Sequence, residues 1–127
     1  MRKEIERWFL QSKEEFDAAR ISFQAKKWFA VAFWCQQAVE KSLKALFMFQ
    51  KKESPGTTHS LTFLGRECNT PVKYSSFLRN LTKEYYMSRY PDASEDVPSD
   101  LYNEQDAKEY MVKSEEFLSW VESQLKK

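Results

Sequence analysis

The sequence is poor in residues that interrupt helices and in residues that build metal or disulfide frameworks. Only two glycines and four prolines occur in 127 residues, which favours long helices over a fold of short strands and turns. The two cysteines, Cys35 and Cys68, are not closely spaced, and His59 is the only histidine. No zinc framework can be assembled from this set, so we expect two reduced thiols, no metal and no cofactor.

The sequence also lacks a net charge of one sign and a long apolar run. Its 20 basic and 19 acidic residues give a formal net charge of +1, unlike the strongly basic chains that bind nucleic acids without sequence preference. No apolar run approaches the roughly 20 residues that span a bilayer. The charged N-terminus, residues 1–4, has no signal-peptide core. We therefore expect a cytoplasmic protein with no membrane segment.

Aromatic residues, by contrast, are abundant, with ten Phe, six Tyr and four Trp. The length fits one domain, which we expect to cover residues 1–127. Such a domain has a limited interior, so some of the rings are expected on a surface. Surface aromatic residues mark subunit interfaces or stacking sites.

Apolar residues recur at three- and four-residue steps, as they do in amphipathic helices. The first helix is expected at residues 2–26, and the last at 104–126 with Asn103 as its cap. The segment 28–51 is apolar around most of its girth and is predicted to be the central helix. Three of its residues are small enough to let another helix approach closely, which favours a dimer: Ala38, Ser42 and Ala45.

The region between these helices predicts a short helix, a long helix and a loop. Thr58 and Ser60 can cap a short helix at residues 60–69, and Thr70 followed by Pro71 can start a fourth long helix that reaches about residue 88. Residues 91–100 hold four acidic residues, two prolines and no basic residue, which is typical of a solvated loop. The predicted fold class is all-α, an antiparallel up-and-down bundle of four main helices plus one short helix.

The first candidate site is a polar stripe on the central helix, formed by Gln37, Glu40, Lys41 and Lys44. One interpretation is a solvent-facing strip in which Glu40 and Lys44 form an i,i+4 ion pair. The other is a cationic ledge that binds a phosphate or an acidic partner.

The second candidate site is the segment from Arg89 to Asp92. Arg89 can complement the dipole of the helix that it ends. Next to Tyr90, it can also contact phosphates or bases. His59 is the only available imidazole base, although its place between cap residues also fits a structural role.

Three segments together resemble the HEPN family of prokaryotic helical domains: FWCQQAVEKSLKAL at 33–46, THSL at 58–61 and SRYPD at 88–92. The resemblance covers nearly the whole chain and implies a bundle of four main helices plus a short one, assembled as a homodimer. It also implies a minimal nucleotidyltransferase as protein partner, in a toxin–antitoxin-type module, and a nucleotide or RNA ligand.

The resemblance further implies a metal-independent ribonuclease motif, an Arg followed after four to six residues by a His. This sequence departs from it: the three possible positions after Arg89 hold Ser94, Glu95 and Asp96, and the three before His59 hold no Arg. The usual general acid or base is therefore missing. Enzymatic activity is left open, and a dimeric binding domain is favoured. Its candidate ligand-binding residues are Gln37, Lys41, Lys44, His59, Arg89, Tyr90 and Asp92.

Three alternatives remain beside this hypothesis. The first is a ribonuclease that uses Arg89 with a non-standard second residue, namely Tyr90, Asp92 or His59. The second is an adaptor whose acidic segment, residues 91–100, docks on a basic surface of another protein. The third is a target of nucleotide attachment, with Tyr90 or Tyr102 as the acceptor.

Overall fold

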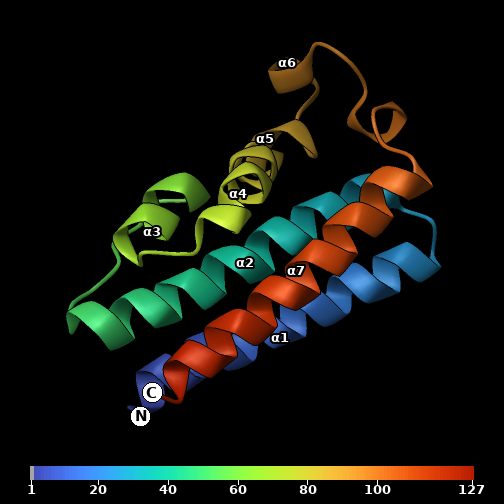
Figure 1. Ribbon diagram of the computed structural model, residues 1–127. Helices are drawn as coiled ribbons and strands as arrows, with labels where there is room; N and C mark the ends of the chain where they lie inside the picture. The colour runs from blue at the N-terminus through green and yellow to red at the C-terminus, as the bar shows by residue number, and fades with distance from the viewer. Residues whose placement is uncertain (1) are drawn as a thin grey trace.

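The computed structural model describes residues 2–127. They form three long helices and a series of short ones, joined by turns and loops (Figure 1). The long helices are α1 (Lys3–Gln24), α2 (Trp28–Lys51) and α7 (Glu104–Leu125). Between α2 and α7 lie α3 (Leu61–Glu67), the 3-10 turn η1 (Val72–Tyr74), α4 (Ser75–Thr82), α5 (Glu84–Met87), α6 (Pro91–Ser94) and the 3-10 turn η2 (Pro98–Asp100). No strand occurs in this part of the chain, and the all-α prediction is confirmed.

Helix α2 is the centre of the bundle, as predicted. Figure 1 shows it between α1 and α7 on one side and the α3–α5 group on the other. Fourteen of its 24 residues are buried. Ala38, Ser42 and Ala45 are all 0% exposed. The close approach of other helices at these small residues is confirmed, and these helices belong to the same chain, so the three residues themselves give no support to a dimer.

The fourth helix does not run unbroken to residue 88, as the sequence predicts, but is divided into η1, α4 and α5. The break between α4 and α5 falls at Lys83. Just before it, the Thr82 hydroxyl accepts a hydrogen bond from the Leu61 backbone N–H at 2.9 Å and donates to the His59 carbonyl at 3.5 Å. These two bonds join the end of α4 to the start of α3.

Two of the four predicted helix caps are present. Thr58 does not cap α3, because its hydroxyl accepts a hydrogen bond from the Ser60 N–H at 3.1 Å and Ser60 is the cap. The Ser60 side chain accepts from the Phe63 N–H at the start of α3, and Asn103 forms a reciprocal capping box with Asp106 at the start of α7. Thr70 does not cap a helix, because its hydroxyl donates to the Gly65 carbonyl at 3.2 Å. Residues 91–100 are also more regular than the predicted loop, since they contain α6 and η2.

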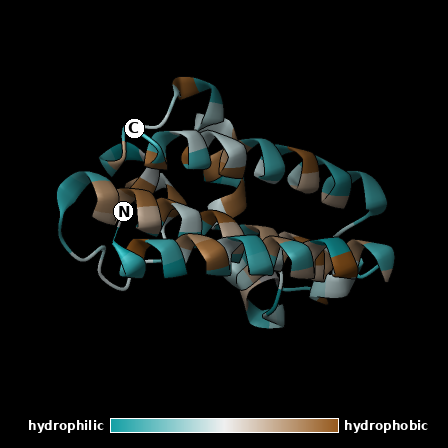
Figure 2. Ribbon diagram, turned by 90° about the horizontal axis from the view of Figure 1, so that it is seen from below, coloured by the Kyte–Doolittle hydropathy of each residue, from teal (hydrophilic) through white to brown (hydrophobic). Residues whose placement is uncertain are grey.

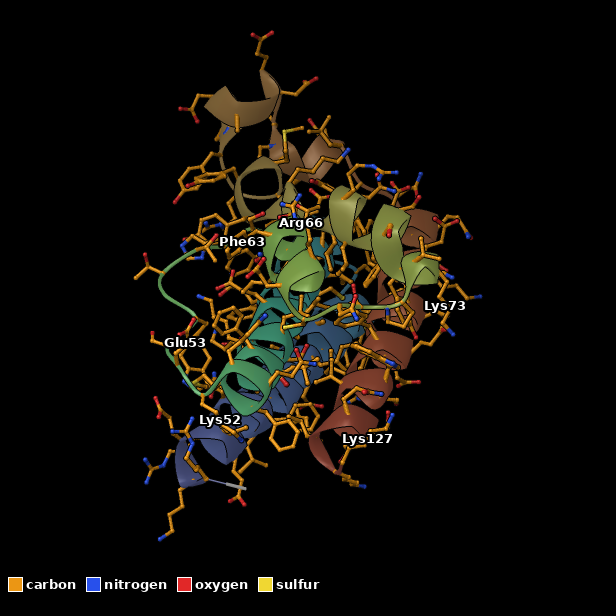
Figure 3. The ribbon with its side chains drawn as sticks, turned by 60° about the vertical axis from the view of Figure 1, so that its left-hand side comes forward. Lys52, Glu53, Phe63, Arg66, Lys73 and Lys127 are labelled. Atoms are coloured by element: carbon orange, nitrogen blue, oxygen red, sulfur yellow. The ribbon has the colours of Figure 1, made fainter. Side chains whose placement is uncertain are left out.

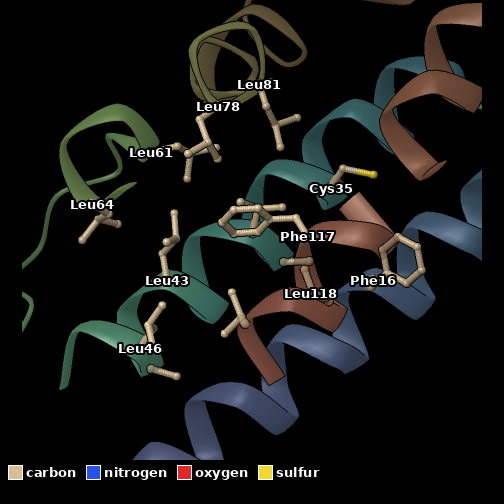
Figure 4. Packing of buried hydrophobic residues seen from close by; sticks show 14 of the residues in the cluster. Phe16, Cys35, Leu43, Leu46, Leu61, Leu64, Leu78, Leu81, Phe117 and Leu118 are labelled. Carbon is tan, nitrogen blue, oxygen red and sulfur yellow. The ribbon is translucent and has the colours of Figure 1, made fainter. Parts of the chain in front are cut away.

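The core extends from α2 to both of its neighbouring groups (Figure 4). Apolar residues lie where the helices face each other, whereas hydrophilic residues predominate on the outward faces (Figure 2). Cys35 and Cys68 are both buried free thiols, and burial raises the pKa of each to about 12. They remain protonated near neutral pH and pack as small apolar groups, as predicted for Cys35.

Candidate functional site

A charged pair lies buried on α2. Glu40 is 3% exposed and Lys44 is 4% exposed, and the Lys44 Nζ lies 3.1 Å from the Glu40 Oε2. The same Nζ lies over the ring of Trp8 from α1, 5.6 Å from its centroid. The predicted i,i+4 pair is confirmed. The interpretation of these residues as a solvent-facing strip is wrong for Glu40 and Lys44, because Trp8 and the chain before α3 cover this side of α2.

Glu40 also holds His59 in a defined orientation. The His59 Nδ1 lies 3.1 and 3.2 Å from the two carboxylate oxygens of Glu40. An ionised carboxylate only accepts hydrogen bonds, so Nδ1 carries the hydrogen and Nε2 is the nitrogen left for other chemistry. Gln36 Nε2 donates to Glu40 Oε1 at 3.1 Å and to the His59 carbonyl at 3.3 Å. Side chain and backbone of His59 are thus both tied to α2.

Tyr85 connects His59 to Arg89. The rings of His59 and Tyr85 stack with centroids 3.9 Å apart and planes 16° apart. The Arg89 guanidinium carbon lies 4.6 Å from the Tyr85 centroid, 4.5 Å from that of Phe33 and 4.8 Å from that of Tyr90. Such distances are those of cation–π contacts. We call Glu40, His59, Tyr85 and Arg89 the His–Arg cluster.

Arg89 also has the structural role that its position predicts. Its Nε donates to the Tyr85 carbonyl at 2.9 Å, at the end of α5. This bond satisfies a carbonyl that the short helix leaves open. The bond also fixes the direction of the side chain, so that the guanidinium lies among three aromatic rings. Arg89 therefore has the predicted role at a helix end, and its contact with phosphates or bases stays a prediction.

Gln37 and Lys41 join the cluster through a line of hydrogen bonds. The Lys41 Nζ donates to Glu15 Oε1 at 2.9 Å and to Gln37 Oε1 at 3.2 Å. The Gln37 Nε2 donates to Gln36 Oε1 at 2.7 Å, and Gln36 leads to Glu40. The two lysines expected on a cationic ledge each have a carboxylate partner inside the protein, Glu15 for Lys41 and Glu40 for Lys44.

Tyr90 and Asp92 lie at the outer edge of the site. Tyr90 is 43% exposed and its ring centroid is 6.1 Å from that of Tyr86, which is 57% exposed. Asp92 is an exposed residue of α6 and forms no hydrogen bond or ion pair with another residue in the part of the chain that the structure describes. The structure therefore brings Tyr90 to Arg89 but does not bring Asp92 into contact with the cluster.

Two members of the cluster do not stand out as site residues in the sequence. The helical spacing indicates Glu40 only as the partner of Lys44, and Tyr85 only as an inward-facing residue of a long helix. A polar Glu in a helix that is otherwise apolar is a usable signal, because a buried carboxylate needs partners. Nothing in the local sequence links Tyr85 to His59, since the contact depends on how α5 packs beside the start of α3.

The described residues hold neither a metal-binding group nor a membrane-spanning helix. Within residues 2–127, no group of three or more His, Cys, Asp or Glu side chains could hold a metal ion. No helix described there is both long enough and apolar enough to cross a membrane.

The fold and the cluster define a small helical bundle with a polar site beside its central helix. The sequence model of the HEPN domain matches residues 5–124, and the chain belongs to the HEPN family. A search of curated protein sequences finds no match.

Two solved structures have the same arrangement of helices. The archaeal HEPN homologue ST0689 is 31% identical, with a TM-score of 0.79, over 98% of this chain and 99% of its own. TT1696 from Thermus thermophilus is 24% identical, with a TM-score of 0.87, over 97% of this chain and 99% of its own. At that identity, the second likeness concerns the fold alone.

Proposed function

We propose that this HEPN protein is a binding domain for a nucleotide or for RNA, and that the His–Arg cluster is its site. The observation that carries the proposal is the position of Arg89, whose guanidinium lies among three aromatic rings. One of these rings, Tyr85, stacks on His59, a side chain that is 42% exposed. Guanidinium groups bind phosphates through a planar fork of donors. Exposed aromatic rings provide faces on which bases stack.

The residues of the site divide into ligand groups and supporting groups. Arg89 contacts a phosphate, Tyr90 offers a ring to a base, and His59 offers its Nε2. Asp92, exposed on α6, can accept a hydrogen bond from a base or a ribose. Three candidates remain. Gln37 and Lys41 lie at the other edge of the site, and Lys44 acts through Glu40.

The proposal includes assembly as a homodimer with a minimal nucleotidyltransferase as partner, in a toxin–antitoxin-type module. Membership of the HEPN family supports it. So does the exposed aromatic surface beside the site, where Tyr86 is 57% exposed and Tyr90 is 43% exposed. Exposed aromatic groups of this kind are enriched where subunits meet.

The test is to incubate the purified protein with nucleotides and a mixed RNA pool and to measure binding and cleavage together. Arg89→Ala should weaken binding at least about tenfold, the effect of losing about 1.4 kcal/mol. The matched control is Arg20→Ala, which removes an exposed arginine of α1 that pairs with Asp17. Circular dichroism should show that both variants keep the fold. Unchanged binding by Arg89→Ala would refute the assignment of the site.

One observation favours ribonuclease activity as a second candidate function. His59 has its Nδ1 held by Glu40 and its ring stacked on Tyr85, which also contacts Arg89. In this second candidate function, His59, from another segment of the chain, takes the place of the histidine that the motif lacks after Arg89. His59 would accept the proton of a ribose 2′-hydroxyl while Arg89 stabilises charge on the phosphate. RNA cleavage lost in both His59→Ala and Arg89→Ala would establish this activity, and absence of cleavage would exclude it.

A further inference from the structure

A second basic site lies between α3 and α4, apart from the His–Arg cluster. It is a cavity of about 390 Å³ to which each of the two helices contributes one arginine, Arg66 from α3 and Arg79 from α4. Figure 3 shows Arg66 on α3, close to Phe63 and at the outside of the bundle. The cavity shares no residue with the cluster, and none of its described lining residues is acidic.

The packing of α3 on α4 is what brings the two arginines together. A Cβ added to Gly65 would lie 2.6 Å from Leu78 Cδ1 and 3.2 Å from Thr70 Oγ1. A larger residue at position 65 would therefore require the side chains of Leu78 and Thr70 to shift, so the two helices meet closely at Gly65. Arg66 follows Gly65 and Arg79 follows Leu78, so each arginine is the next residue after one side of this contact. Their common cavity is a consequence of the helix packing and not of flexible side chains alone.

The charges in this cavity are not compensated by the protein. Among residues 2–127, no carboxylate lies close enough to Arg66 or Arg79 to form an ion pair, for which the N–O distance is at most 4.0 Å. The Arg79 Nη2 donates to Ser76 Oγ at 3.2 Å. This bond holds one nitrogen of the guanidinium group in place. The chain as a whole has a net charge of +1, so two arginines at one cavity without an acidic residue form a local excess. Two positive charges at one cavity attract an anion.

The other lining residues suit a ligand with polar groups. The rim includes the hydroxyls of Thr62 and Ser75 and the amide of Asn69. These groups donate and accept hydrogen bonds. A volume of about 390 Å³ lies within the range of small-molecule sites, roughly 300–1,000 Å³, and exceeds what a phosphate ion alone fills.

We propose that the Arg66–Arg79 cavity binds a phosphate group carried by a ligand with hydroxyl groups. Two guanidinium forks match the oxygens of a phosphate, and the rim matches the hydroxyls of a sugar. The phosphate belongs either to a small phosphate ester or to an RNA strand. Both sources present the same chemistry to the cavity, and binding measurements separate them.

The test uses inorganic phosphate, ribose 5-phosphate and a single-stranded RNA oligonucleotide as probes of the folded protein. Binding is followed by calorimetry for the wild type, Arg66→Gln, Arg79→Gln and the double variant, with Arg20→Gln as the control for an exposed arginine. Each single variant should bind inorganic phosphate and the ester at this cavity at least about tenfold more weakly, and the double variant should keep only the binding that Arg89→Ala removes. The control should bind as the wild type does.

The RNA arm distinguishes the two sources. If the cavity holds a phosphate of RNA, the slope of log K against log salt concentration falls in magnitude by about 0.7 in the double variant, because the two arginines share one phosphate and each phosphate neutralised on a single strand contributes about 0.7. If the ligand is a small ester, the RNA slope is unchanged while ester binding is lost. Binding of all three probes that is unaltered by the double variant, or absent from the wild type, overturns the proposal. Arg89→Ala tests the other site and leaves this result unaffected.

Discussion

Two glutamates are buried to nearly the same degree but have opposite kinds of partner. Glu40 on α2 is 3% exposed, and Glu84 on α5 is 4% exposed. Glu40 contacts an ammonium group and an imidazole, those of Lys44 and His59. Glu84 accepts hydrogen bonds from two phenols, those of Tyr102 and Tyr110. The comparison separates a carboxylate balanced by opposite charge from one that relies on neutral donors.

The neutral partners of Glu84 go with raised pKa values for Glu84 itself and for both tyrosines. Burial raises the pKa of Glu84 above its ordinary value, and the hydrogen bonds from Tyr102 and Tyr110 only partly oppose this effect. Burial, with the contact to Glu84, also raises the pKa of both tyrosines. All three groups therefore stay closer to their neutral forms than in water, and Tyr102 is engaged inside the protein.

The two clusters accordingly have different uses. The His–Arg cluster, which contains Glu40, reaches the surface through His59, whose side chain is 42% exposed. The buried carboxylate of Glu40 therefore orients a ring that a ligand of the proposed site would meet. The Glu84 cluster links α5 to the start of α7 through Tyr110 and to the segment before α7 through Tyr102. These hydrogen bonds hold α5 against α7 and against the segment before α7.

Removing Glu40 is expected to have the largest effect on stability. Glu40→Leu leaves the ammonium group of Lys44 buried at 4% exposure without its carboxylate. Loss of one partner of a buried ion pair costs about 3–5 kcal/mol. Urea unfolding of the wild type and the variant should show a decrease of that size in the free energy of unfolding.

The double variant Glu40→Leu with Lys44→Met provides the control for this prediction. Replacing both members of a buried pair by apolar residues is often nearly neutral, so the double variant should recover most of the lost stability. A single variant that loses less than about 1 kcal/mol, or a double variant no more stable than the single one, would contradict the assigned role of the pair.

Much of this fold could be predicted from the sequence, because it depends on local patterns. The central position of α2 follows from apolar residues around its girth, and the caps at Ser60 and Asn103 follow from side chains next to their helices. The break at Lys83 could not be predicted in this way. Thr82, next to the break, bonds to Leu61 and His59, which are 21 and 23 residues distant, and no local pattern indicates such contacts.

The site was predictable in some of its members but not in its arrangement. Residue type and spacing are enough to make candidates of Gln37, Lys41, Lys44, His59 and Arg89. The sequence pattern cannot tell a charged residue on a solvent-facing strip from one that a neighbouring helix covers, and Lys44 is covered by Trp8. The link from His59 to Arg89 passes through Tyr85, and this link exists only in the packed structure.

Glu84→Gln should change the pH dependence of stability. The raised pKa of Glu84 means that the folded protein binds this proton more tightly than the unfolded chain does. Stability therefore falls as pH rises from the ordinary value of 4.5 through the raised pKa. Glutamine removes this loss and can still accept a phenol hydrogen bond, so the stability of the wild type relative to Glu84→Gln should decline over this window. Urea titrations at several pH values test the prediction, with the exposed Glu115→Gln as control; a relative stability that rises with pH would contradict it.

The smallest effect is expected for Lys41→Met, at an ion pair with a shorter N–O distance than that of Lys44. The Lys41–Glu15 pair has its atoms 2.9 Å apart, but its side chains are 21% and 9% exposed, against 5% and 4% for Lys44 and Glu40. Glu15 also keeps a hydrogen bond from Gln11 Nε2 at 2.9 Å. Water screens the more exposed pair, so Lys41→Met should cost at most about 1 kcal/mol in urea unfolding, and Lys44→Met should cost more. Equal losses would show that burial is not what distinguishes the two lysines, and a larger loss for Lys41→Met would show that the shorter distance outweighs the screening.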